Sequence, residues 1–242
     1  MRLKSLVAAL TAVLCAGSLA AQRPQILPTS RTPVAPVGSQ VGTPVAVPAL
    51  DPENTLNLDI STGGRVVIQL RPDVAPKHVE RVKALARQGF YNGVIFHRVI
   101  EGFMAQTGDP TGTGTGGSEL PDLNAEFNAL PHVRGTVSAA RASEENSANS
   151  QFFIMFAPRF SLDGKYSVFG RVVSGMNYVD AIERGEPPAA PSRILRASVA
   201  ADNIPPPAPG EVIPAPVRAP APPATPVQPA PQPAEQPQPN PQ

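Results

Sequence analysis

The decisive stretch of the chain reads Phe96-His97-Arg98-Val99-Ile100-Glu101-Gly102-Phe103-Met104-Ala105-Gln106-Thr107-Gly108-Asp109. It begins as an apolar strand that carries one cation, Arg98, and continues through Phe103 and Met104 to a glycine turn. We expect Phe103 and Met104 to be exposed, so that a fixed hydrogen-bond donor lies beside an apolar pocket. Such a pairing suits a reaction in which charge shifts but no bond is cleaved.

The prolines divide the remaining chain into segments. Of 32 prolines, seven lie in 22–52 and sixteen in 205–242, so residues 53–203 are predicted to form one globular domain. We interpret 22–52 as a disordered Pro-rich spacer. The Pro/Ala/Gln-rich tail 204–242 is predicted to be disordered because it lacks the large apolar residues that offset ordering entropy. A net charge of +1 without a basic stripe argues against a nucleic-acid partner.

Residues 1–21 have the pattern of a secretory signal peptide. Arg2 and Lys4 precede an apolar run over 5–16, and Ser18-Leu19-Ala20 then predicts cleavage after Ala20 or Ala21. We therefore expect export to the periplasm, cell envelope or extracellular space, with no stable membrane insertion after cleavage. The alternatives are an uncleaved anchor or a buried helix. The single cysteine, Cys15, lies inside the run, so the mature chain has no thiol.

Strand patterns dominate the domain. Strands are predicted at 56–60, 65–70, 135–140, 151–156 and 167–173, with another starting at 94. One helix is predicted to open at Ala75-Pro76 and end before a left-handed Gly89, and a second to cover 176–183. The pattern predicts a mainly β fold, a closed antiparallel barrel in which closure removes exposed edges.

Several kinds of chemistry are disfavoured by the motifs. The three histidines, His78, His97 and His132, have no metal-ligand spacing, and we expect His78 and His132 to be surface residues. There is no Gly-x-Ser-x-Gly sequence for a nucleophilic serine. The loop 112–117 lacks the Lys-Ser/Thr and the following helix of a phosphate loop. We therefore predict no metal and no cofactor.

Four motifs remain, and with them residues 55–200 resemble the cyclophilin family of peptidyl-prolyl cis-trans isomerases. They are the Phe96–Asp109 string, Gly114-Thr115-Gly116-Gly117, Ser150-Gln151-Phe152-Phe153-Ile154, and Leu162-Asp163-Gly164 with Val168-Phe169-Gly170. The resemblance implies a closed eight-stranded antiparallel β-barrel capped by two α-helices. It also implies catalysis of rotation about X-Pro bonds.

The resemblance places the site on twelve residues. It implies that Arg98 is the catalytic donor and that Gln106 orients it or contacts the substrate carbonyl. It implies a proline pocket formed by Phe103, Met104, Phe153 and Leu162, with Tyr166 at the rim. His97 and the backbone of Arg141 are expected to contact substrate, and Gly114, Ala140 and Gln151 to line the neighbouring groove. Phe96 is assigned to the core because its side chain points opposite to that of His97.

Three positions depart from the best-known eukaryotic pattern. Ser161 stands where that pattern has a tryptophan that contacts cyclosporin, so weak cyclosporin binding is expected. Tyr166 replaces a histidine and Arg141 an asparagine, as in bacterial members.

Two functions remain open from the sequence. The first is a monomeric isomerase of proline-containing, unfolded or partly folded exported polypeptides. The alternative is a non-catalytic binding module for proline segments, or an envelope chaperone, for which the Pro-rich tail is the motive. The tail could also occupy the protein's own groove.

Overall fold

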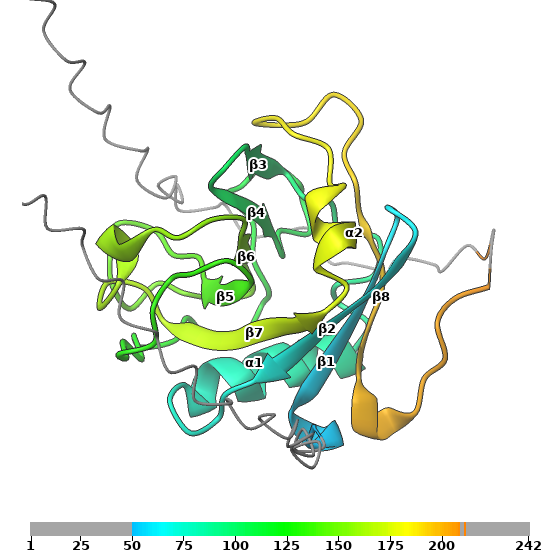
Figure 1. The fold of residues 1–242 in the computed structure, drawn as a ribbon. Helices are drawn as coiled ribbons and strands as arrows, with labels where there is room; N and C mark the ends of the chain where they lie inside the picture. The colour runs from blue at the N-terminus through cyan, green and yellow to red at the C-terminus, as the bar shows by residue number, and fades with distance from the viewer. Residues whose placement is uncertain (1–49, 209–210, 212–242) are drawn as a thin grey trace, which may run out of the picture. The chain divides into compact units, whose positions relative to one another are not determined.

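The computed structural model describes residues 50–208 and Glu211, and these build one antiparallel sheet with two α-helices (Figure 1). The predicted signal peptide, nearly all of the spacer and most of the tail lie outside the described residues. The strands are β1 Thr55–Ile60, β2 Gly64–Leu70, β3 Arg98–Ile100, β4 Met104–Thr107, β5 Thr136–Ala139, β6 Phe152–Met155, β7 Val168–Ser174 and β8 Ile194–Val199. Their order across the sheet is β3-β4-β6-β5-β7-β2-β1-β8. The eight antiparallel strands are thus confirmed.

The sheet is a curled half-barrel that stays open between β3 and β8, so the predicted full closure is wrong. The short β3 cannot continue the ladder, because the backbone groups on its free edge are already used. The N–H of Val99 donates to the carbonyl of Gly185 at 2.8 Å, and the N–H of Gly185 donates to the carbonyl of Val99 at 2.9 Å. The segments ahead of the two edge strands meet at the isolated bridge between Ile95 and Arg193. Backbone hydrogen bonds flank this bridge, from Gly93 to Ile194, from Phe96 to Ser192 and from Ile194 to Val94. The strand predicted from residue 94 accordingly starts at Arg98.

The two helices lie near the positions that the pattern predicts. Helix α1, Pro76–Arg87, has proline in its first turn, buries Val79, Val82, Leu85 and Ala86, and packs against β7 and β8. It ends before Gly89, whose φ of 68° is the left-handed conformation that favours glycine. Helix α2, Met176–Asp180, packs against β2 and ends before the predicted Glu183, because the N–H of Ile182 already closes a tighter turn onto Val179.

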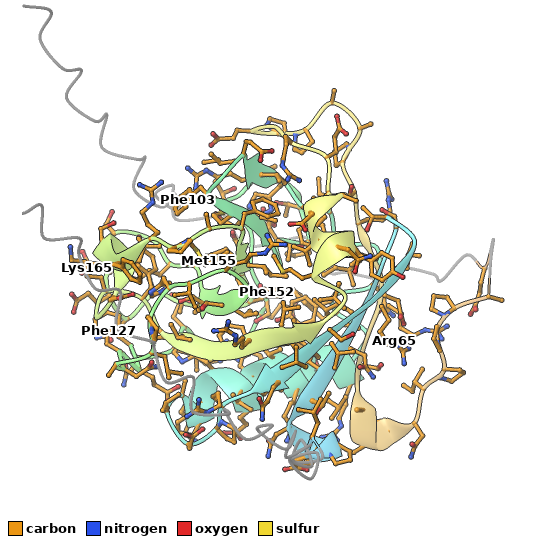
Figure 2. The ribbon with its side chains drawn as sticks, viewed as in Figure 1. Arg65, Phe103, Phe127, Phe152, Met155 and Lys165 are labelled. Carbon is orange, nitrogen blue, oxygen red and sulfur yellow. The ribbon has the colours of Figure 1, made fainter. Side chains whose placement is uncertain are left out.

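The main core fills the concave side of the sheet. The strands contribute alternate residues to it, among them Leu56, Leu58 and Ile60 from β1. In β6, Phe152, which is labelled in Figure 2, belongs to this core. Its ring meets those of Tyr91 and Phe169 edge-on, at 5.6 and 6.1 Å. Phe96 is fully buried in the same core, as predicted. Within the described part of the chain, no helix has the length and apolar character that crossing a membrane requires.

Candidate functional site

The register of three neighbouring strands places Arg98, Gln106 and Phe153 in one row. Arg98 of β3 pairs with Gln106 of β4, and Gln106 pairs with Phe153 of β6. Residues opposite one another in antiparallel strands project to the same face. The predicted donor, the predicted amide and one wall of the predicted pocket therefore meet, although they come from separate motifs.

A second apolar cluster covers this face. It consists of Phe103, Met104, Ala140, Phe153, Met155, Leu162 and Tyr166, with Ile100 packed against it. Every apolar side chain predicted for the pocket belongs to it. Met155 was missed, although its two-residue spacing from Phe153 puts it on the same face of β6. Phe103 and Met104 are buried, so the predicted exposure of these two side chains is wrong.

A polar hollow of about 500 Å³ adjoins the row. It is lined by His97, Arg98, Gln106, Gly112, Thr113, Gly114, Thr115, Glu186 and Pro187. Arg98 is only 7 % exposed and donates from Nε to Glu186 Oε2 at 2.7 Å. The Glu186 side chain is 47 % exposed, so it balances the buried cation and stays in contact with water.

Sequence reasoning missed Glu186. It lies 88 residues after Arg98 and arrives through the loop that holds the edge of β3. The Gly185-Glu186-Pro187-Pro188 run signals a turn in the sequence, but nothing local to it indicates a contact with β3.

Gln106 and Gln151 join the hollow to the loop at 112–116. Gln106 Nε2 donates to Gln151 Oε1 at 2.9 Å, and Gln151 Nε2 donates to the carbonyls of Gly114 and Gly116. Gly114 has a φ of 85°, a conformation that side-chain-bearing residues rarely adopt. Gln106 lines the hollow, and its Oε1 is a buried acceptor without a hydrogen-bond partner among the described residues.

Asp109 fixes the start of this loop. Its carboxylate accepts hydrogen bonds from the N–H and hydroxyl of Thr111 and from the N–H of Gly114. Burial alone would raise the pKa of Asp109, but these hydrogen bonds outweigh it and hold the pKa below its usual value. The last residue of the opening motif is therefore the anchor of the groove wall.

His97 lies beside Gly114 at the bottom of the hollow. It is 5 % exposed, and neither ring nitrogen has a hydrogen-bond partner within the described residues. Burial lowers its pKa; the charge of Asp109 opposes this shift and that of Arg98 adds to it. A neutral ring that faces the hollow can donate or accept one hydrogen bond to a bound chain.

Tyr166 and Arg141 close the other end of the site. The Arg141 guanidinium lies 4.8 Å from the Tyr166 ring centroid and donates to the carbonyls of Ala142, Ser143 and Lys165. Burial raises the pKa of Tyr166, and the charges of Arg141 and Arg98 oppose the shift. The electrostatic influence of Arg98 thus extends to the rim of the apolar cluster.

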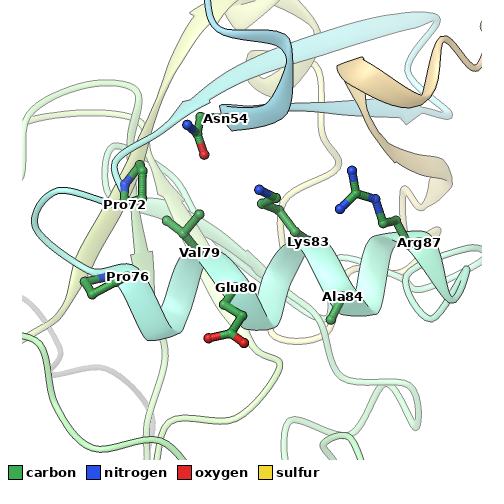
Figure 3. A pocket seen from close by; sticks show the side chains of 8 residues that line it. All are labelled: Asn54, Pro72, Pro76, Val79, Glu80, Lys83, Ala84 and Arg87. Atoms are coloured by element: carbon green, nitrogen blue, oxygen red, sulfur yellow. The ribbon is translucent and has the colours of Figure 1, made fainter.

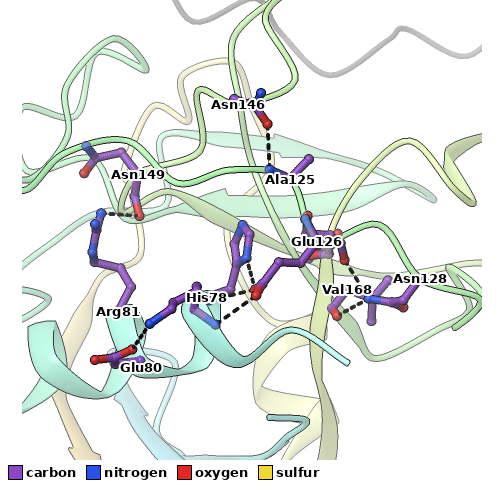
Figure 4. Close-up of polar contacts among 12 residues, drawn as sticks. His78, Glu80, Arg81, Ala125, Glu126, Asn128, Asn146, Asn149 and Val168 are labelled. Atoms are coloured by element: carbon purple, nitrogen blue, oxygen red, sulfur yellow. Dashed lines mark hydrogen bonds and ion pairs between the residues drawn. The ribbon is translucent and has the colours of Figure 1, made fainter. Parts of the chain in front are cut away.

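The other two histidines are buried, so their predicted surface positions are wrong. His78 Nδ1 lies 2.6 Å from Glu126, which also accepts the N–H groups at the start of α1 (Figure 4). His132 bonds Asp163 through Nδ1 at 2.8 Å and Ser138 through Nε2 at 3.2 Å. Both link loops to the body of the domain. No group of three or more potential metal ligands occurs among residues 50–208 and Glu211.

A second hollow of about 470 Å³ lies along α1 (Figure 3). The cations on its wall, Lys83 and Arg87, are both paired with Glu53, and no unpartnered buried polar group lines it. The polar groups of this hollow are therefore paired, whereas the hollow at Arg98 is lined by His97 and Gln106, which keep buried side-chain atoms without a hydrogen-bond partner among the described residues.

Comparison with known proteins gives concordant results. Residues 56–199 match the family model described as cyclophilin type peptidyl-prolyl cis-trans isomerase/CLD. A probable peptidyl-prolyl cis-trans isomerase of Brucella suis is 50% identical over 183 residues, covering 69% of this chain and 93% of the relative. A Hirschia baltica cyclophilin aligns with a TM-score of 0.59 and 30% identity, over 63% of this chain and 76% of that one. A Cryptosporidium parvum cyclophilin-type isomerase, determined in the presence of the dipeptide Ala-Pro, aligns with a TM-score of 0.56 and 30% identity, over 60% of this chain and 98% of that one.

The burial of His97 predicts a pH-dependent stability. Its folded-state pKa lies below the unfolded reference of 6.5, so below that pH the unfolded chain binds more protons. We expect the free energy of unfolding to fall between about pH 7.5 and 5.5, above the range where Asp109 and Glu126 protonate. His78 and His132 shift the same way, so His97→Gln is expected to reduce the slope and not remove it.

The measurement is urea unfolding of the wild type and His97→Gln across this range. Equal slopes in the two proteins would contradict the assignment to His97.

Proposed function

The chain belongs to the cyclophilin-type peptidyl-prolyl cis-trans isomerase family, and on this premise we propose that Arg98 accelerates X-Pro bond rotation in exported polypeptides. The observation that carries the proposal is the row of Arg98, Gln106 and Phe153 across β3, β4 and β6. It sets a fixed cation at the border of the apolar cluster.

The reaction needs little more than a fixed hydrogen-bond donor beside an apolar site. Rotation about X-Pro is slow because the amide is conjugated. In the twisted transition state the conjugation is lost, and the nitrogen becomes pyramidal and regains a lone pair. A donor aimed at that nitrogen, together with an apolar seat for the ring, binds the twisted form better than either planar form.

The residues divide these tasks as follows. The cluster around Phe103, Met104 and Phe153 seats the ring, while Arg98 donates to the nitrogen. Gln106 Oε1 and His97 hold the substrate backbone in the hollow, and the Gly114 wall confines the residue in the groove. The protein needs neither metal nor cofactor for this step, and we propose that it acts as a monomer.

Replacing Arg98 tests the catalytic assignment. Arg98→Ala is expected to lower kcat/KM for a proline peptide by about 10²–10³-fold, the effect of losing one preorganised donor. Arg98→Lys is expected to restore little, because an ammonium lacks the planar fork. Arg171→Ala, which removes an exposed arginine of β7, serves as the control.

Rates equal to the wild type in Arg98→Ala would reject Arg98 as the catalyst. Peptide binding by the wild type without faster exchange in an NMR experiment would instead support the non-catalytic binding module.

The pattern of residues 1–21 supports the exported location. We expect the exported protein, isolated by cell fractionation, to begin at Ala21 or Gln22 on N-terminal sequencing, with the solution mass of one chain. A product retained in the cytoplasm with Met1 intact would contradict export, and a doubled mass would contradict the monomer.

Ser161 supports weak cyclosporin binding. It is exposed in the short helix Phe160–Leu162, where a hydroxymethyl group offers neither a large apolar contact nor an indole N–H. We expect Ser161→Trp to tighten inhibition of isomerase activity by cyclosporin, with peptide turnover as the readout. Submicromolar inhibition of the wild type would contradict this expectation.

A further inference from the structure

Arg159 is an arginine at the apolar cluster whose guanidinium has no polar partner among the described residues. Its guanidinium carbon lies 5.1 Å from the ring centroid of Phe103, and no hydrogen bond or ion pair of its side chain occurs within residues 50–208 and Glu211. Other arginines in this part of the domain are held by carboxylates or carbonyls: Arg98, Arg134, Arg141 and Arg184.

The backbone holds Arg159 in place on both sides. Its N–H donates to the carbonyl of His132 at 2.7 Å, and its own carbonyl accepts the N–H of Leu162 at 3.1 Å. Leu162 belongs to the apolar cluster, and the guanidinium lies over the ring of Phe103. The half-buried cation is therefore positioned at the border of the proline pocket before any substrate binds.

The position along β4 determines which part of a substrate meets Arg159. Phe103 precedes β4, three residues from Gln106, which is a separation of about 10 Å along a strand. Gln106 lies at the end that joins the Gly114 groove through Gln151. Arg159 therefore lies at the opposite end of the site, where a bound substrate would extend away from the Gly114 groove.

The Arg159 guanidinium can bind an acceptor that a ligand supplies. Two carboxylates close to Arg159 or Phe103 in sequence have other partners, because Asp163 accepts from His132 through Oδ1 and Glu101 pairs with Arg184. A guanidinium presents its N–H donors in one plane and matches a carboxylate bidentately, while an aromatic ring covers its face.

We propose that Arg159 is a specificity-determining residue that binds the side-chain carboxylate of an Asp or Glu flanking the substrate proline, on the side away from the Gly114 groove. This inference rests on the proposed isomerase function. It assigns the enzyme a preference among proline sites, namely for those with an acidic neighbour.

The test compares peptides that differ at one flanking position, with Asp against Asn and Glu against Gln. The acidic residue is placed on either side of the proline, and the peptides are amidated so that no terminal carboxylate competes. With the full chain we expect the acidic peptide to have a kcat/KM about twofold to fivefold higher at one flank, an advantage that added salt reduces. In Arg159→Gln the acidic-to-neutral ratio is expected to approach one, and in Arg159→Lys to lie between.

The ratio is measured within each protein, so a general loss of activity divides out. Arg171→Gln removes the same charge from an exposed site on β7 and is expected to keep the wild-type ratio. A ratio near one at both flanks in the wild type, or one that persists in Arg159→Gln or is lost equally in Arg171→Gln, overturns the inference. Absence of any acceleration by the wild type would instead overturn the proposed function itself.

Discussion

The register of β4 between β3 and β6 is the constraint on which the rest of the site depends. Along β4, Ala105 faces the main core, while Met104 and Gln106 face the site. A slip of one residue would exchange these faces and bury Gln106 in the core. The same alternation in β6 sends Phe152 inward and Phe153 outward. Core packing therefore fixes the functional face, because a slipped β4 would bury the Gln106 amide in the main core.

Within that frame, the placement of Arg98 is an electrostatic compromise. A guanidinium this deeply buried has lost much of its hydration, and Glu186 compensates through Nε from the loop after α2. That loop also occupies the free edge of β3 through Gly185. The feature that keeps the half-barrel open is thus the feature that delivers the counter-charge. The loop after α2 therefore both covers the free edge of β3 and balances the charge of Arg98.

Much of this organisation could be predicted because local sequence patterns specify it. The two-residue period predicts most strands, and Pro76 and Gly89 bracket α1 correctly. The apolar residues that the family resemblance assigned to the pocket do gather in one cluster. The failures concern long-range contacts. His78 and His132 have no apolar signature, and they are buried because Glu126 and Asp163, both distant in sequence, satisfy them. Strands β4 and β8 were not predicted from the pattern as separate strands.

The sequence by itself identified the family and, through it, the kind of chemistry, because a long motif of fixed spacing carries both; the same motif predicts Arg98 as the donor. Only the tertiary structure decided how far the sheet closes, that Glu186 balances Arg98, and that Arg159 lies unpaired over Phe103 among the described residues. The physical reason is that a side chain's direction follows from its own strand. Its partner depends on which distant segment the packed core brings alongside.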